Sequence, residues 1–213
     1  MKFDLDLENV SKEINNRNAK KILIQLPEGM KMYANEIADH LVKNTKAQII
    51  VSGNSNWGGC DLALDEARNL KVDLLIHFGH AQFIKVDFPV LYVEVKDNTD
   101  LMPLLQQSLF NIKSFSNIGL VSSVQHLHKL EEAKKFYEAN KKDIIIPGKK
   151  GFAAYDGHVV GCEYNSLKLI QDKVDAFIVL GNHFHSLGAA LSVNKPVILL
   201  DTYNMEVVNM ENL

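Results

Sequence analysis

An internal repeat is the feature of this sequence that most constrains its fold. Gly-Cys-acid triplets stand at residues 59–61 and 161–163, and Lys-Val-Asp triplets stand at residues 71–73 and 173–175, so one offset of 102 residues relates both pairs. The two cysteines of the chain, Cys60 and Cys162, therefore occupy the same place in both copies. Because a fixed period of this kind indicates repeated structural units, we predict two domains. Residues 1–100 would carry Cys60 and residues 101–213 would carry Cys162.

Both copies contain short apolar runs separated by helical or turn-forming stretches. The runs lack the alternation of a half-exposed strand, which is typical of a parallel sheet covered on both faces. We therefore predict an α/β fold of two homologous domains, each with a roughly four-stranded parallel sheet flanked by helices. The predicted strands are residues 20–26, 47–52, 73–78, 89–95, 117–122, 143–147, 175–180 and 196–201. The tail at residues 202–213 gives no clear element.

Composition excludes several classes of function. The formal net charge of −3 gives no sign of a surface for nucleic acid or an anionic membrane. No apolar run approaches the roughly 18 residues of a membrane helix, and the polar N-terminus is not a signal peptide. Two cysteines do not make a disulfide framework. We therefore expect a cytoplasmic protein in a reducing compartment.

The cysteines are the candidate functional groups. Each follows a predicted strand, at the sheet edge where open α/β sheets place their ligands. We expect Cys60 and Cys162 each to begin a helix, where N–H groups and the helix dipole stabilise a thiolate. The alternative is a buried cysteine that acts only as a small hydrophobic side chain.

Two kinds of metal centre agree with these residues. The pairs His77/His80 and His183/His185 also follow strands, so a mixed cysteine–histidine zinc site is one interpretation, although no closely spaced zinc motif is present. Thiolates that converge from separate repeats fit an iron–sulfur cluster better. Two cysteines are too few for such a cluster, so a third ligand would have to come from outside this chain.

Several segments together resemble the diphthamide-biosynthesis family of 2-(3-amino-3-carboxypropyl)histidine synthases. They are ILIQLPEGMK, GGCDLALDEA with HFGHA after it, DGHVVGCEY, and GNHFHSLGAAL followed by PVILLDTYN. The resemblance implies that Cys60 and Cys162 ligate a 4Fe–4S cluster and that S-adenosylmethionine is the co-substrate. Gly181, His183 and His185 are the candidate S-adenosylmethionine contacts, because they follow a strand into the same edge of the sheet.

The activity that the resemblance implies is a radical transfer. A 3-amino-3-carboxypropyl group would pass to C2 of a histidine on translation elongation factor 2, which is the first step of diphthamide biosynthesis. The family has a third domain with a third cysteine, so we expect this chain to be a fragment of a protein that is a homodimer at full length. The alternatives are a non-catalytic subunit that holds a cluster or relays electrons, and an enzyme similar to quinolinate synthase.

Overall fold

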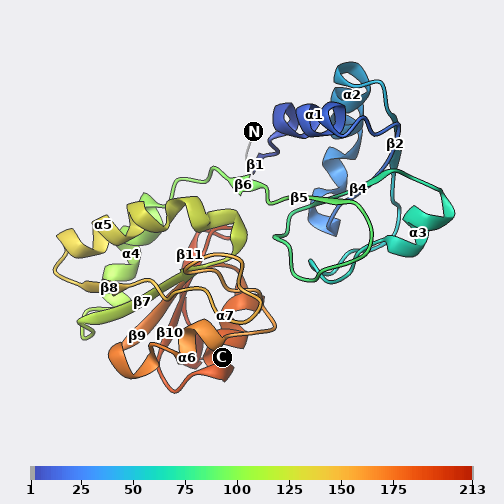
Figure 1. Ribbon diagram of the computed structural model, residues 1–213. Coiled ribbons are helices and arrows are strands. Elements are labelled where there is room, and N and C mark those ends of the chain that lie inside the picture. The colour runs from blue at the N-terminus through green and yellow to red at the C-terminus, as the bar shows by residue number, and fades with distance from the viewer. Residues whose placement is uncertain (1–2, 213) are drawn as a thin grey trace. The chain divides into compact units, whose positions relative to one another are not determined.

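The computed structural model describes residues 3–212, which fall into two compact units, one of residues Phe3–Val95 and one that begins at Lys96 (Figure 1). We propose that these units are the two predicted repeats. The first unit contains β1 (Phe3–Asp4), α1 (Leu7–Asn16), β2 (Lys21–Gln25), the 3₁₀ helix η1 (Glu28–Tyr33), α2 (Ala34–Asn44), β3 (Gln48–Val51), α3 (Leu64–Asn69), β4 (Leu74–Phe78) and β5 (Val90–Val93).

The second unit has more elements. They are β6 (Lys96–Asp97), α4 (Met102–Asn111), β7 (Asn117–Ser122), η2 (Val124–Lys129), α5 (Leu130–Ala139), β8 (Asp143–Ile145), α6 (Asn165–Lys168), η3 (Gln171–Lys173), β9 (Ala176–Gly181), α7 (His183–Ser192), β10 (Val197–Asp201), β11 (Glu206–Asn209) and η4 (Met210–Asn212).

Both units contain the predicted parallel sheet, so the fold class is confirmed. The first sheet has the strand order β3-β2-β4-β5, and all three of its pairings are parallel. The second sheet has the order β8-β7-β9-β10-β11. Its first four strands are parallel and follow the same order of succession along the chain as the four strands of the first sheet.

The fifth strand of the second sheet was not predicted. β11 pairs antiparallel with β10, and Asp201 lies directly opposite Glu206 across the hairpin. The strand contains only the short apolar pair Val207 and Val208 between polar residues, a pattern too weak to indicate a strand without its partner. The tail therefore does contain a regular element, and it forms the edge of the sheet.

Helices cover both faces of each sheet (Figure 1). In the first unit, α1 and α2 pack on one face and α3 packs on the other. In the second unit, α4 and α5 share one face and α6 and α7 the other. Strand β9 is apolar on both sides because both sides are covered. Ile178 packs on the face of α4 and α5, and Phe177 and Val179 pack on the face of α6 and α7. All six residues of β9 are buried.

Candidate functional site

Cys60 lies in the loop between β3 and α3, and its side chain is a free, exposed thiol. The prediction that it begins a helix is wrong, because α3 begins at Leu64. The backbone instead turns at Gly58, whose carbonyl oxygen accepts a hydrogen bond of 3.0 Å from the N–H of Asp61. Gly59 must be a glycine here, since a Cβ atom would lie 2.8 Å from the carbonyl oxygen of Ala81.

The acidic residue after Cys60 closes this loop. Asp61 Oδ2 accepts a hydrogen bond of 3.0 Å from the N–H of Trp57. Its main-chain carbonyl oxygen accepts from the side-chain amides of Gln25 and Asn56, both at 2.7 Å. Since Gln25 is the last residue of β2 and is buried, the loop that presents Cys60 is tied to the centre of the sheet.

A chain of buried polar groups continues from Gln25 to two histidines. Gln25 Oε1 accepts from the N–H of Ala63 at 3.1 Å and lies 2.9 Å from His77 Nδ1. Because an amide oxygen only accepts, His77 carries its proton on Nδ1, and its Nε2 accepts from His80 Nδ1 at 3.0 Å. Burial, assisted by the neighbouring His80, lowers the pKa of His77 to about 3. Burial also lowers the pKa of His80. The two rings are therefore neutral at physiological pH.

Cys162 is also exposed and forms no disulfide, and it lies in the loop before α6. It too does not begin a helix, because α6 is a single turn that begins at Asn165. Glu163 takes the part that Asp61 has in the first unit, since its carboxylate accepts from the N–H of Phe152 at 3.2 Å and from that of Asn165 at 2.6 Å. Because both thiols are exposed, the interpretation of the cysteines as buried hydrophobic side chains is wrong.

The loop of Cys162 contacts the first turn of α7. Gly161 has a φ of +77°, and a Cβ atom there would lie 2.5 Å from the ring of Phe184 and 3.4 Å from Cδ2 of His185. Only glycine adopts this positive φ without strain and also leaves room for the two rings. The Tyr164 hydroxyl lies nearby, and burial, assisted by the charge of Cys162, raises the pKa of Tyr164 to about 12.

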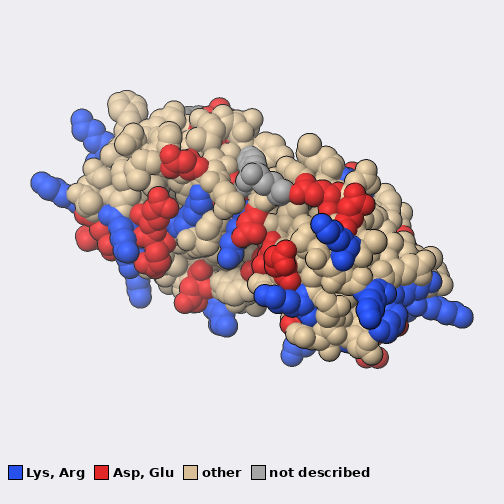
Figure 2. All heavy atoms as spheres, turned by 90° about the horizontal axis from the view of Figure 1, so that it is seen from above, with Lys and Arg blue, Asp and Glu red and all other residues tan. Residues whose placement is uncertain are grey.

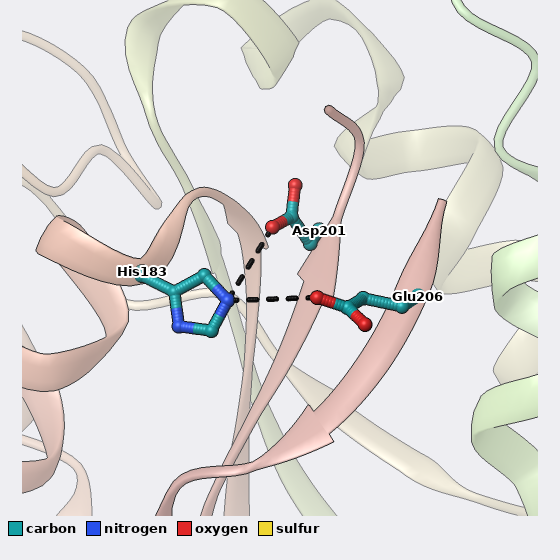
Figure 3. Close-up of side chains that lie close together, drawn as sticks. All are labelled: His183, Asp201 and Glu206. Carbon is teal, nitrogen blue, oxygen red and sulfur yellow. Dashed lines mark ion pairs between the residues drawn. The ribbon is translucent and has the colours of Figure 1, made fainter. Parts of the chain in front are cut away.

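The three residues predicted to contact S-adenosylmethionine stand at the junction of β9 and α7. Gly181 is the buried last residue of β9. His185 Nδ1 lies 2.9 Å from the side-chain oxygen of Asn182, which also caps α7. His183 faces elsewhere, since its Nε2 lies 3.5 Å from Asp201 Oδ2 and 3.7 Å from Glu206 Oε1 (Figure 3). The structure thus places His185 beside the Cys162 loop and turns His183 toward the β10–β11 hairpin.

Comparison with known proteins decides the family. Residues 26–213 match the family described as "Putative diphthamide synthesis protein". The chain belongs to this diphthamide synthesis family. It is 30% identical over 206 residues to the 2-(3-amino-3-carboxypropyl)histidine synthase of Pyrococcus horikoshii, a match that covers 95% of this chain and 59% of that protein. It is 29% identical to subunit 1 of the human synthase of the same name, and covers 46% of that protein.

A solved structure supports the same assignment. The crystal structure of Dph2 from Pyrococcus horikoshii with a 4Fe-4S cluster superposes with a TM-score of 0.88 at 29% identity. The match covers 98% of this chain and 62% of that one. The chain thus spans about three fifths of the archaeal relative that it matches.

The geometry of this diphthamide-family chain does not favour the mixed cysteine–histidine zinc site. His77 and His80 hydrogen-bond to one another, so His77 Nε2 is already engaged as an acceptor. Within residues 3–212, one group of three or more potential metal-ligating residues has its ligand atoms close together, and it contains no cysteine. That group is His183 with Asp201 and Glu206.

Three residues at the sites of this diphthamide-family protein were missed in the sequence. Gln25 and Asp201 are the last residues of β2 and β10, so their positions at the carboxyl edge of a parallel sheet were a usable signal. Glu206 lies on β11, a strand that the sequence did not indicate, so no pattern could have placed it beside His183.

Charged side chains of both signs are mixed on the surface (Figure 2). Lys and Arg side chains are interspersed with Asp and Glu side chains over the face shown in Figure 2. This mixture agrees with the small net charge of the family member. In the part of the chain that the structure describes, no helix is long and apolar enough to cross a membrane.

Proposed function

We propose that this chain takes part in the first step of diphthamide biosynthesis, the S-adenosylmethionine-dependent transfer of a 3-amino-3-carboxypropyl group to a histidine of translation elongation factor 2. One observation carries the proposal. Cys60 and Cys162 are both exposed and outside any disulfide, and each lies in a loop next to the carboxyl edge of a parallel sheet, 102 residues apart in the repeat. The solved relative from Pyrococcus horikoshii is described with a 4Fe-4S cluster, which is a group that thiolates hold.

The two cysteine loops fit the ligation of such a cluster. Each thiol is accessible, and in each loop the next residue is an acid whose carboxylate binds main-chain N–H groups of the same loop. These hydrogen bonds hold the loops through the acidic side chains. Cys60 and Cys162 would supply two thiolate ligands. When bound, the cluster would supply an electron for reductive cleavage of S-adenosylmethionine.

The remaining groups of this chain would position the reactants. Gln25 and the neutral His77 and His80 hold the Cys60 loop without adding a positive charge beneath it. Gly181 and His185 are the proposed contacts to S-adenosylmethionine, because they lie at the end of β9 beside the Cys162 loop. The family match gives the quinolinate-synthase-like alternative no support.

Anaerobic reconstitution with iron and sulfide tests the proposal. We expect the full-length protein, in which a further ligand joins the two thiolates, to bind iron and sulfide and to give a reduced-cluster signal in electron paramagnetic resonance. Cys60→Ala and Cys162→Ala should each abolish the signal, because each removes one of the two thiolates. Ser55→Ala, an exposed position in the same loop as Cys60, is the matched control and should retain it.

A zinc-containing or metal-free product after reconstitution would contradict the proposal. If the cluster forms, the next measurement is dithionite-driven release of methylthioadenosine, with the mass of added elongation factor 2 followed in parallel. A stable cluster without either product would favour the alternative of a subunit that holds a cluster or relays electrons. Size-exclusion chromatography of the full-length protein tests the proposed homodimer.

A further inference from the structure

Three potential metal-ligating side chains, none of them a cysteine, meet at the carboxyl edge of the second sheet. His183 is the first residue of α7, Asp201 is the last residue of β10 and Glu206 is the first residue of β11. The strand register brings them together, because Asp201 pairs with Gly181 on one side and with Glu206 on the other. The side chains point toward one another in Figure 3, and their ligand atoms all lie within 4.8 Å of one another.

The charges in this cluster are unbalanced. Carboxylates directly opposite each other in an antiparallel pair repel, and Asp201 and Glu206 occupy such a position. Asp201 is only 2% exposed, and its other partners are the amide groups of Tyr203 and Asn204, which carry no charge. Among the described residues, His183 is the ionisable group that lies within ion-pair distance of both carboxylates. A bound cation would remove the repulsion.

The spacing distinguishes between possible cations. The separations of 3.5 Å and 3.7 Å between His183 Nε2 and the carboxylate oxygens exceed the roughly 2.7–2.9 Å of a charge-assisted hydrogen bond. Ligand atoms arranged tetrahedrally at about 2.1 Å from a zinc ion lie about 3.4 Å apart. Acceptors arranged around an ammonium nitrogen at about 2.8 Å would lie about 4.6 Å apart. The two separations that involve His183 are closer to those around a metal ion, and the third ligand atom pair lies within 4.8 Å.

We propose that His183, Asp201 and Glu206 form a binding site for a divalent transition-metal cation such as Zn²⁺, separate from the thiolate ligands. One imidazole nitrogen and two carboxylate oxygens suit this class of ion. Asp201 is already oriented, because Oδ1 accepts from two main-chain N–H groups and Oδ2 accepts from the Asn204 side chain. Hydrogen bonds of this kind hold ligating carboxylates in place. In this proposal His183 ligates a metal ion and does not contact S-adenosylmethionine.

The exposure of the site indicates its coordination. His183 and Glu206 side chains are 46% and 50% exposed, so solvent reaches the side of the cluster opposite Asp201. Three protein ligands would leave one position of a tetrahedral ion for water, which is the arrangement of zinc sites with an open position. The inference does not depend on the proposed transferase activity.

Zinc titration of the full chain tests the site. Because exposed thiolates are zinc ligands in general, the titration uses the Cys60→Ser/Cys162→Ser variant, in which two exposed side chains are changed. Isothermal titration with zinc chloride, together with metal analysis after gel filtration, should give one tightly bound ion per chain. His183→Ala and Glu206→Gln, each in that background, should weaken binding by at least about tenfold, since both remove a ligand.

The matched control is His185→Ala. It removes an imidazole that lies two residues after His183 and is hydrogen-bonded to the side chain of Asn182. This variant should bind zinc as tightly as the background protein. Circular dichroism of every variant verifies that the fold is retained; Asp201 is left unchanged because it holds the hairpin. Binding of no zinc, binding that neither His183→Ala nor Glu206→Gln weakens, or equal weakening by His185→Ala would overturn the proposal.

Discussion

Replacement of His77 should make the first unit less sensitive to acid. The ring is fully buried, and its pKa is lowered to about 3 chiefly because burial disfavours the charged form. An unfolded histidine titrates near 6.5. Between these two pH values the unfolded chain therefore binds a proton that the folded chain excludes. Stability must fall as the pH decreases through this window, and it must rise with pH in the same range.

The size of this stability loss follows from the titration of His77 in the unfolded and the folded chain. On going from about pH 7.5 to about pH 5, an unfolded ring with a pKa near 6.5 becomes almost fully protonated, while folded His77 stays neutral. The linkage relation converts this difference into a loss of about 2 kcal/mol in the free energy of unfolding for this one ring. His77→Asn removes the titrating group and keeps an amide that can donate to Gln25 Oε1 in place of Nδ1. Its acid-induced loss should be smaller by about that amount.

Urea unfolding at the two pH values, followed by circular dichroism, measures the effect. The quantity compared is the change in the free energy of unfolding between the two pH values, so any pH-independent cost of the substitution cancels. Lys12→Gln changes an exposed residue of the same unit and is the control, which should lose as much stability as the wild type. Equal losses in wild type and His77→Asn would refute the argument that His77 is held neutral by burial.

Three further outcomes follow from single contacts. Asp73→Asn and Asp175→Asn should each lower the free energy of unfolding by about 1 kcal/mol near neutral pH, because each carboxylate accepts two main-chain hydrogen bonds that lower its pKa. Urea titrations should show the difference decrease as the pH falls below the ordinary carboxyl pKa and disappear only below the lowered pKa of the folded state. Gly119→Ala should cost about 1–3 kcal/mol in thermal unfolding, since its Cβ would lie 2.4 Å from Phe177. Tyr164→Phe should not destabilise the chain, because the buried hydroxyl has no hydrogen-bond partner among residues 3–212.

The strands could be predicted from the sequence because burial on both faces imposes a visible pattern. Residues 117–122, for example, were predicted as a strand and form β7 with the same bounds. Ile118 and Leu120 pack on one face of that strand and Val121 packs on the other, which requires apolar residues without alternation. The edge strand β11 is not buried on both faces, so it need not be apolar throughout. It is a strand because it pairs with β10, and a local sequence pattern does not reveal that pairing.

The helix starts beside the cysteines could not be predicted in the same way. Ala63 and Tyr164 directly precede α3 and α6, and neither side chain caps its helix, so these two positions hold no start signal. Asn182 does cap α7, and an asparagine at this position was an available signal that the helix begins at His183. Local chemistry therefore determines α7, whereas tertiary packing determines the short helices after the cysteine loops.

The internal repeat supports the assignment of one role to both cysteines. Asp73 Oδ2 accepts from two main-chain N–H groups at the start of β2, and Asp175 Oδ2 accepts from two at the start of β7. Residues at the offset of 102 therefore make the same contact in their own units. The same offset relates Cys60 to Cys162, although the loops before them differ in sequence. Asp73 and Asp175 are equivalent in their hydrogen bonds as well as in their position in the repeat. One ligand role for both thiols is therefore a stronger expectation than two unrelated roles.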